Sequence, residues 1–398
     1  MSGPRHNADR SDGFTLIELL IVLGILVGFL AMLVQFVDIG VRLFDSGEAG
    51  QALADRTEVA RIAVERELRS ITADCRRVEP GVPPDRLLVQ QLPFGLPARA
   101  TADDPRAFCL RAGIALSPLE EERLRHDAML ARAYVELGVG ADRAAVTARA
   151  QELEAASGLR GRGRLLLAQW PETTDGALIE LRVGRFLPDQ MIQKGDAVVD
   201  PFAVPVPGSG ELTSVLLHTN TDLLVGGLLH AELQLWSQAT TGWEQTGPNG
   251  PELVWDSARA GWLSDPADGP VFRFDRDAAS LLDPTDDVHP RALRVTLVVA
   301  EDQNRPPAGL LADPLERDGN ALQLVNGDAF PGDEGGGFVK VEGEWVRYAS
   351  RDGDTLRGLQ RGQRGTRAKE HAGGAALRVG RTVQFTVMLP HGKDDWNG

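Results

Sequence analysis

The feature that most constrains this chain is an apolar run that begins directly after a short polar leader. From Phe14 to Val37 the sequence reads FTLIELLIVLGILVGFLAMLVQFV, in which Glu18 is the only ionisable residue. As a helix with a rise of about 1.5 Å per residue, this run is long enough to cross the roughly 30 Å hydrocarbon core of a bilayer. The sequence therefore predicts one membrane-spanning helix near the N-terminus.

The leader indicates which way this helix crosses the membrane. Arg5, His6 and Arg10 precede the apolar run, and an excess of basic residues in a short flank marks the cytoplasmic side. A secretory signal peptide also joins basic residues to an apolar region and is then removed. Here the run is too long for a signal peptide, carries an acid and lacks a small-x-small cleavage site at its far end. We therefore expect an anchor whose following domain lies outside the cytoplasm.

The residues Gly13-Phe14-Thr15-Leu16-Ile17-Glu18, with the apolar helix after them, closely resemble the type IV pilin and type II secretion pseudopilin superfamily. Its precursors share a short leader ending in glycine, then Phe-Thr-Leu-Ile-Glu and an apolar helix. The resemblance covers only the beginning of the chain. It implies that a prepilin peptidase cleaves between Gly13 and Phe14 and methylates the new amino terminus of Phe14. Residues 1–13 would then be a leader peptide, and residues 14–44 a transmembrane and polymerisation helix.

The resemblance also implies a role for Glu18, with Thr15 beside it, in filament assembly. A carboxylate within a membrane span costs on the order of 2.5 to 3.5 kcal/mol, so Glu18 should have a partner. That partner is either the charged amine of Phe14 in a neighbouring subunit or the amino terminus of the same chain. The other implied partners are prepilin peptidase, further minor and major pseudopilins or pilins, and an inner-membrane assembly platform. The implied location is the bacterial inner membrane, with a single span and the head in the periplasm.

Length and charge limit what the head can be. The chain has 398 residues and a formal net charge of −15. This is about twice the length that a compact head and its helix need, because ordinary domains have ~100 to 150 residues. The acidic charge argues against nucleic-acid binding over the whole surface. We therefore expect insertions or a second domain and no general nucleic-acid partner.

Two cysteines, Cys75 and Cys109, are the only ones in the chain. If the head lies in the bacterial periplasm, the compartment is oxidising and favours disulfides. A bridge would join the end of the long helix to the start of the head. The alternative, two buried unpaired thiols, stays open because the sequence does not give their separation.

The apolar helix is expected to continue well beyond the membrane. Residues 45–78 keep apolar residues at mostly three- and four-residue steps, whereas Arg61, Glu65 and Arg69 mark a solvent face. The prolines at 80, 83 and 84 end the pattern. The predicted helix is one rod, half in the membrane and half on a globular head.

The rest of the chain predicts an α+β fold, in which the helix packs on an antiparallel pilin-like head over residues 45–300. A helical insertion is expected over residues 117–157, because Ser117-Pro118 offers a cap followed by proline at the first helical position. Alternating apolar segments predict strands, at residues 86–92, 164–170, 177–183, 212–219, 228–237, 252–255, 271–274 and 292–300.

A weaker resemblance concerns the late strands. Leu228 to Trp243, followed by His289-Pro290-Arg291 and Ala292 to Leu297, is similar to the J-type minor pseudopilin pattern, in which a proline opens a late strand. The closing strand of that pattern matches residues 382–390, so residues 301–381 are expected to be an inserted small β module. The module resembles small β units of phage tail and surface proteins, with turns at Glu342-Gly343 and Asp352-Gly353.

The predicted module carries a basic island with two aromatic residues, Trp345 and Tyr348. Such a set could hold DNA or an anionic glycan through charge and stacking. Alternatively, the cations pair with local acids on a small β surface. The island comprises Arg347, Arg351, Arg357, Arg361, Arg364, Arg367 and Lys369.

Metal and catalytic sites have little support in the sequence. Clustered aspartates could bind Ca²⁺, but no EF-hand spacing is present and aspartate is also common in turns. No phosphate loop, nucleophile elbow or paired-histidine motif occurs, so we expect no enzymatic activity, no metal and no cofactor. The aspartates are Asp275, Asp277, Asp283, Asp286 and Asp287.

Together these patterns predict a minor pseudopilin-like subunit at the tip of a type II secretion pseudopilus. The alternative is a minor type IV pilin at a pilus tip, whose inserted module binds a surface, a glycan or DNA.

Overall fold

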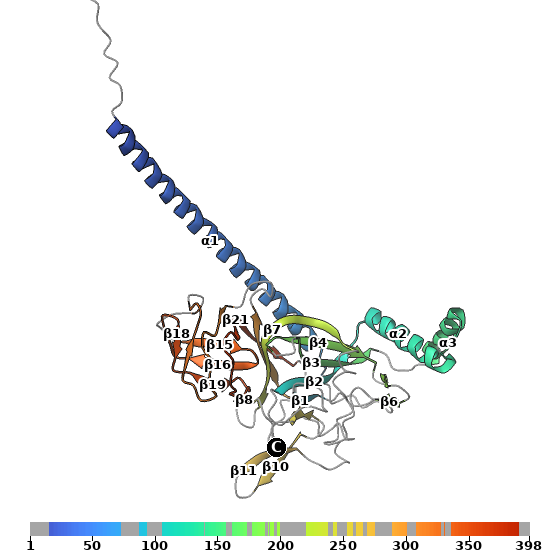
Figure 1. Ribbon diagram of the computed structural model, residues 1–398. Helices are drawn as coiled ribbons and strands as arrows, with labels where there is room; N and C mark the ends of the chain where they lie inside the picture. The colour runs from blue at the N-terminus through green and yellow to red at the C-terminus, as the bar shows by residue number, and fades with distance from the viewer. Residues whose placement is uncertain are drawn as a thin grey trace, which may run out of the picture. The chain divides into compact units, whose positions relative to one another are not determined.

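The protein is described by a computed structural model with an N-terminal helix and an antiparallel sheet (Figure 1). It divides into two compact units, residues 1–54 and residues 55–398. The structure describes residues 16–72, 87–93, 106–138, 140–156, 161–172, 177–187, 190, 192–194, 197–199, 220–237, 242–244, 253–257, 260–265, 269–274, 289–300, 308–327, 330 and 336–389.

Helix α1 spans Leu16–Arg69 without a break. Its last part belongs to the second unit, where Ala60, Val64 and Leu68 are buried at four-residue steps. On the exposed side, Arg61 and Arg69 each pair with Glu65, as the spacing of these residues predicts. The helix is therefore amphipathic in the head, with one face in the core.

The prediction that the helix continues to residue 78 is wrong at its end. After Arg69 the chain changes to extended pairing: Ile71 forms an antiparallel bridge with Ile114, and the Thr72 amide donates to the Gly113 carbonyl oxygen at 2.9 Å. β-Branched Ile71 and Thr72 suit an extended backbone better than a helix. Pairing with the sheet thus ends the helix before the prolines do.

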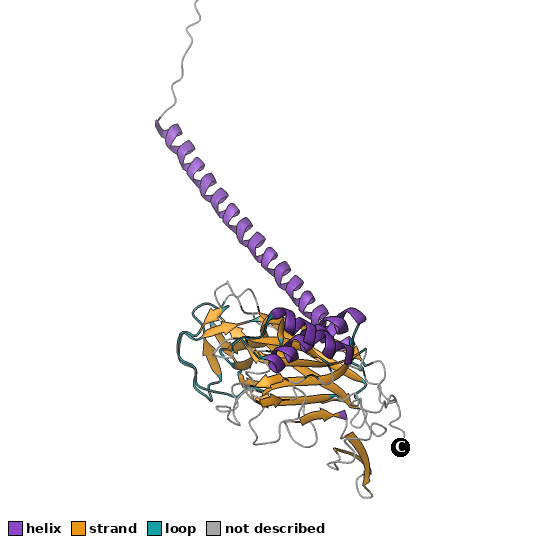
Figure 2. Cartoon of the chain, turned by 90° about the vertical axis from the view of Figure 1, so that its right-hand side faces the viewer, coloured by secondary structure: helices purple, strands orange, loops and turns teal. Residues whose placement is uncertain are grey.

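A nine-stranded antiparallel sheet forms the body of the second unit (Figures 1 and 2). Its order is β21-β12-β7-β4-β3-β2-β1-β9, with β8 paired to β7. The strands are β1 Leu88–Pro93, β2 Arg106–Ala115, β3 Arg162–Pro171, β4 Ile179–Phe186, β7 Asp222–Ser237, β8 Gly242–Glu244, β9 Leu253–Asp256, β12 Ala292–Ala300 and β21 Gly380–Met388.

The middle of this sheet is covered on both faces. Leu165, Leu166 and Leu167 of β3 are all 0% exposed, although neighbouring residues of a strand point to opposite faces. The class is therefore α+β, an N-terminal apolar helix with an antiparallel sheet. Residues 212–219, predicted as a strand, lie outside the described residues, and the predicted domain boundaries stay predictions.

Two helices, α2 Pro118–Leu137 and α3 Arg143–Ala156, occupy the segment for which the sequence predicts helices. Ser117 caps α2 in a reciprocal arrangement with Glu120, and Pro118 is the first helical residue. The two helices bury a small apolar cluster of their own, made by Met129, Ala133, Val146 and Ala150. The described residues also form two short antiparallel strand pairs outside the large sheet. These are β5 Ile192–Lys194 with β6 Ala197–Val199, and β10 Ala260–Asp265 with β11 Gly269–Phe274.

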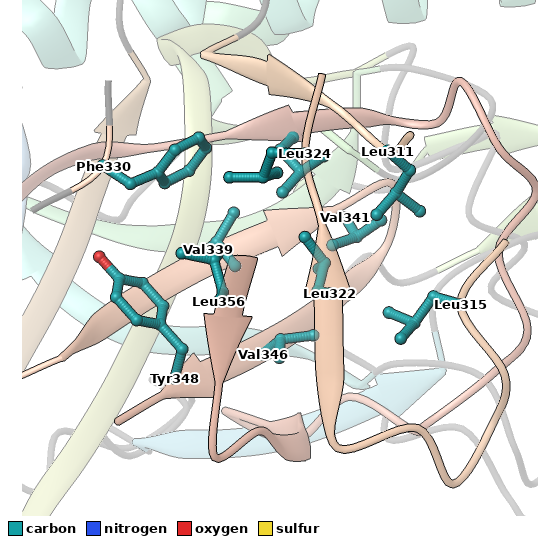
Figure 3. Close-up of a cluster of buried hydrophobic side chains, with 11 residues drawn as sticks. Leu311, Leu315, Leu322, Leu324, Phe330, Val339, Val341, Val346, Tyr348 and Leu356 are labelled. Carbon is teal, nitrogen blue, oxygen red and sulfur yellow. The ribbon is translucent and has the colours of Figure 1, made fainter. Parts of the chain in front are cut away.

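Residues 308–378, here called the C-terminal β module, lie in the chain between β12 and β21. They form one five-stranded and one three-stranded antiparallel sheet around a separate apolar core, shown in Figure 3. Its strands are β13 Gly309–Leu310, β14 Ala321–Gln323, β15 Gly337–Val341, β16 Glu344–Tyr348, β17 Ser350–Asp352, β18 Thr355–Arg357, β19 Gln360–Gln363 and β20 Ala376–Arg378.

The two predicted turns of the module are confirmed. Val341 pairs with Glu344 across Glu342-Gly343. Asp352 pairs with Thr355 across Gly353-Asp354, so the predicted Asp352-Gly353 lies within this turn, and Gly353 has a φ of +57°.

We expect truncation of a large side chain in the module core to destabilise the module. Leu356 is 0% exposed within this core, so Leu356→Ala should lower the free energy of unfolding by about 2 to 5 kcal/mol. Urea denaturation of the full chain in detergent, followed by hydrogen exchange of module amides, measures this change. Val325→Ala is the matched control because Val325 is 62% exposed. Equal effects of the two substitutions would contradict the assigned core.

Candidate functional site

The first candidate site is the apolar segment of α1, Leu19–Gly40. Its length and composition are those of a membrane span or of a signal sequence. Its large side chains are exposed, for example Phe29 at 60% and Phe36 at 77%. Water disfavours so much contiguous apolar surface, which agrees with either a membrane span or a signal sequence.

The residues predicted for processing and assembly lie at the start of this helix. Glu18 belongs to the first turn of α1, and its side chain lies outside the described residues. Gly13, Phe14 and Thr15 also lie outside them. Cleavage, methylation and the pairing of Glu18 therefore stay predictions.

Cys109 is a buried thiol on β2. Burial raises the pKa of this thiol, and the nearby Arg111 opposes that effect. Cys75 lies outside the described residues, so the predicted Cys75 to Cys109 disulfide stays a prediction.

A buried ion pair fastens the head part of α1 to the sheet. Glu67 has a side chain only 3% exposed, and its Oε2 accepts from Nη2 and Nε of Arg185 on β4 at 2.7 and 3.1 Å. Arg185 also pairs with Glu120 on α2. One guanidinium therefore links α1, β4 and α2, and it compensates the charge of a carboxylate held out of water.

The most highly connected polar group in the described part of the module is the carboxylate of Glu344. Arg361 donates to this carboxylate from Nε and Nη2 at 2.7 and 2.8 Å. The amides of Gly362 and Lys369 donate to it at 3.0 and 3.1 Å, and His371 Nε2 lies 2.9 Å away. These contacts fix the segment after β19 against β16, so we call this set the Glu344 hub.

The environment of Glu344 strongly favours the charged carboxylate. Burial alone raises its pKa, but hydrogen bonds from His371, Arg361 and two backbone amides outweigh burial and lower the pKa to about 2. His371 also reaches Glu342 through Nδ1 at 3.0 Å. The hub is thus a buried, charge-assisted network in which each member depends on the others.

A second polar group lies where the module contacts the large sheet. Trp345 packs with Leu178, Leu229, Val298 and Ala300 of the sheet region. Beside it, Lys340 Nζ donates to the Leu229 carbonyl oxygen at 2.8 Å. We call this contact between the module and the large sheet the junction. It combines the buried side chain of Trp345 with the buried ammonium group of Lys340.

His230 of β7 is a further titratable group at this junction. Its ring lies edge-on to Trp345 at 6.1 Å, and its Nε2 is 3.4 Å from Glu232. Burial lowers the pKa of His230, and the positive charges of Arg364 and Lys340 lower it further, whereas Glu232 opposes both effects. The junction therefore favours a neutral imidazole.

The contacts of the basic island favour local pairing over ligand binding. Arg361 belongs to the Glu344 hub, and the Arg364 guanidinium lies 4.5 and 4.4 Å from the ring centres of Phe338 and Trp345. Three more island members have partners, since Arg351 donates to Gly327, Arg357 pairs with Asp352 and Lys369 pairs with Glu342.

The two aromatic residues of the island are not accessible to a ligand. Trp345 is 2% exposed and Tyr348 is 1% exposed, so neither ring can stack on a base or a sugar. This burial excludes stacking of a base or a sugar on either ring, which the interpretation of the island as a ligand-binding site requires.

Sequence reasoning named Trp345, Arg361, Arg364 and Lys369 but missed four polar groups of the junction and the hub. Glu344, His371, Lys340 and His230 carry no spacing motif, because their partners come from strands far apart in the chain. The predicted aspartate cluster at residues 275–287 lies outside the described residues. Within the described ranges, no group of three or more His, Cys, Asp or Glu side chains could hold a metal ion.

Comparisons with known proteins give no match of any kind. No protein-family model, no curated protein and no solved structure is significantly similar to this chain.

Glu344→Gln should destabilise the module by about 3 to 5 kcal/mol at pH 7, because it leaves the buried Arg361 without its carboxylate. In the unsubstituted chain the folded pKa of about 2 lies below the ordinary value of 4.5. The stabilisation is therefore complete above pH 4.5 and is lost as the pH falls toward 2. Hydrogen exchange at the Gly362 and Lys369 amides measures the change. Glu370→Gln, at an exposed neighbouring position, is the control and should change little.

His230 should make the junction sensitive to mild acid. Because its folded pKa is lowered, stability is full above about pH 6.5 and falls as the pH drops below the ordinary histidine range. His230→Phe should therefore reduce the difference in unfolding free energy between pH 7 and pH 5. His126→Phe, at an exposed position of α2, is the control. An unchanged pH dependence in His230→Phe would refute the assignment.

Proposed function

We propose that this chain is a minor pseudopilin-like subunit that assembles at the tip of a type II secretion pseudopilus and supports protein secretion. A prepilin peptidase cleaves it after Gly13 and methylates Phe14. The observation that carries the proposal is the order of features at the start of the chain: a polar leader, Gly13-Phe14-Thr15-Leu16-Ile17-Glu18, and then an exposed apolar helix.

The apolar helix has a physical reason to move from lipid into a filament. Its exposed apolar side chains can pack equally well against acyl chains or against the apolar helices of neighbouring subunits. Glu18 breaks this equivalence, because a carboxylate in lipid is costly while a neighbouring amino terminus neutralises it. Assembly thus gives Glu18 the partner that the membrane lacks.

The head supports a subunit of low copy number. The second unit carries the large sheet, the α2–α3 pair and the C-terminal β module. Such bulk would crowd every repeat of a helical filament, whereas a tip position imposes no repeat. The proposed location is the bacterial inner membrane with a single span and the head in the periplasm, and the partners are the peptidase, other pseudopilins and the assembly platform.

A minor type IV pilin is the second candidate, because both classes share the leader motif. The separate core of the C-terminal β module favours it, since such a unit could contact a surface at a pilus tip. A deletion strain distinguishes the two. Loss of secreted enzymes with normal adhesion supports the pseudopilin, and loss of adhesion with normal secretion supports the pilin.

The deciding measurement is N-terminal peptide mass spectrometry of the native protein extracted from membranes that contain its own peptidase. A chain that begins at methylated Phe14 supports the proposal. A chain that begins at Met1, or that is cut beyond Phe44, overturns both candidates.

Glu18→Ala should leave cleavage unchanged and abolish incorporation into filaments, because the substitution removes only the assembly carboxylate. Co-purification with sheared filaments measures incorporation. Glu48→Ala is the control, since Glu48 is an exposed acid of the same helix outside the apolar segment. Incorporation of Glu18→Ala at the level of the control would refute the role given to this residue.

A further inference from the structure

The strand β21 is the terminal strand of the large sheet in the part of the chain that the structure describes. It pairs with β12 along its whole length, from Gly380 opposite Ala300 to Met388 opposite Ala292, without a bulge. Among the described residues no other strand pairs with it. Its second side is therefore an open row of backbone groups in the part of the chain that the structure describes.

The register identifies which groups point outward. The Leu389 amide donates to the Arg291 carbonyl oxygen at 3.1 Å. Because antiparallel pairs alternate between bonded and non-bonded positions, the odd-numbered residues of β21 bond to β12. The even-numbered residues point their amide and carbonyl groups away from β12: Gly380, Thr382, Gln384, Thr386 and Met388.

This edge lacks the features that usually prevent strand addition. Proteins protect edges with proline, lysine, bulges or inward charges. The sequence of β21 is GRTVQFTVM, in which Arg381 is the only charged residue. Val383 and Phe385 are half-buried, and Met388 is 60% exposed. A further strand beside β21 would cover this apolar surface.

We propose that β21 pairs with β21 of a second copy of this chain, antiparallel and centred on Gln384. This register overlaps the two strands over their whole length and pairs the outward backbone groups reciprocally. It brings Gln384 opposite the partner's Gln384 and Thr382 opposite the partner's Thr386. The same surface serves both copies, as an isologous dimer requires.

Side-chain chemistry agrees with this pairing. On one face, Val383 lies opposite the partner's Phe385, and aromatic residues opposite β-branched ones stabilise antiparallel pairs, as do facing threonines. Arg381 lies opposite the partner's Val387, so the two arginines stay apart. A parallel arrangement would instead place the arginines side by side, and like charges in that position are destabilising.

The C-terminal residues of the same chain fit this edge less well. Residues 391–398 read HGKDDWNG, and aspartate, asparagine and glycine are depleted in strands. The pairing does not depend on the proposed function, since it follows from the backbone and side chains of β21 alone.

Cysteine cross-linking of the full chain in detergent tests the pairing and its register. Bonded antiparallel pairs have Cα atoms about 5.5 Å apart, within the ~4.4 to 6.8 Å of a disulfide. Gln384→Cys should therefore give a covalent dimer under mild oxidation. Thr382→Cys should give none, because the two copies of this residue would lie about 13 Å apart at ~3.3 Å per residue. The unsubstituted chain measures the background from Cys75 and Cys109.

Equal dimer yields from the two cysteine variants, or none above background from Gln384→Cys, overturn the proposal. A second measurement is the sedimentation mass of Thr386→Pro, which removes one outward amide without touching the bonds to β12. We expect Thr386→Pro to be a monomer and the control Thr386→Val to stay a dimer, with circular dichroism confirming that both are folded. A folded Thr386→Pro that remains a dimer contradicts the pairing.

Discussion

The strand β12 is the element on which the second unit depends. It is bonded on one side to β7 and on the other to β21, and nearly every residue from Ala292 to Ala300 has a partner on both sides. Four of its side chains are at most 1% exposed, those of Leu293, Val295, Leu297 and Val299. Because a shift of one residue would move these side chains to the opposite face, the register is strongly specified. The chain enters and leaves the C-terminal β module at the end of this ladder, where Ala300 pairs with Gly380, and the module also contacts the sheet through Trp345 and Lys340.

The module holds its charged groups in a different way from α1. In α1, Arg61, Glu65 and Arg69 lie at the surface, where such pairs contribute little to stability. In the Glu344 hub the carboxylate is 0% exposed, so its bonds are stronger and the loss of one partner is more costly. The hub therefore adds charge-assisted contacts to the apolar core that the module already has. Three of its arginines act inward on groups of the same module: Arg361 on a carboxylate, Arg364 on two aromatic rings and Arg351 on a backbone carbonyl.

Local signals in the sequence were sufficient for the helices and for many strands. Ser117-Pro118 predicts the start of α2, and the alternation in residues 292–300 gives β12 with the bounds that the structure has. The strand β2 was missed because Arg106–Ala115 contains two arginines and little alternation, and its burial comes from neighbours on both sides. The end of α1 was misplaced for a related reason, since Ile71 pairs with a residue far along the chain. The hub and the junction depend on such distant contacts, which no local pattern encodes.

The attachment of the module has a consequence for how this protein can change over generations. Ala300 and Gly380 are directly paired, so the chain leaves the sheet and returns to it at neighbouring positions. At Gly380 a Cβ atom would lie 2.3 Å from the Val299 carbonyl oxygen. Glycine is therefore needed where the chain re-enters the sheet. An ancestor with a short turn between these two strands would have had the same sheet. Modules of other sizes could replace this one at the same two residues, leaving the register of the large sheet unaltered.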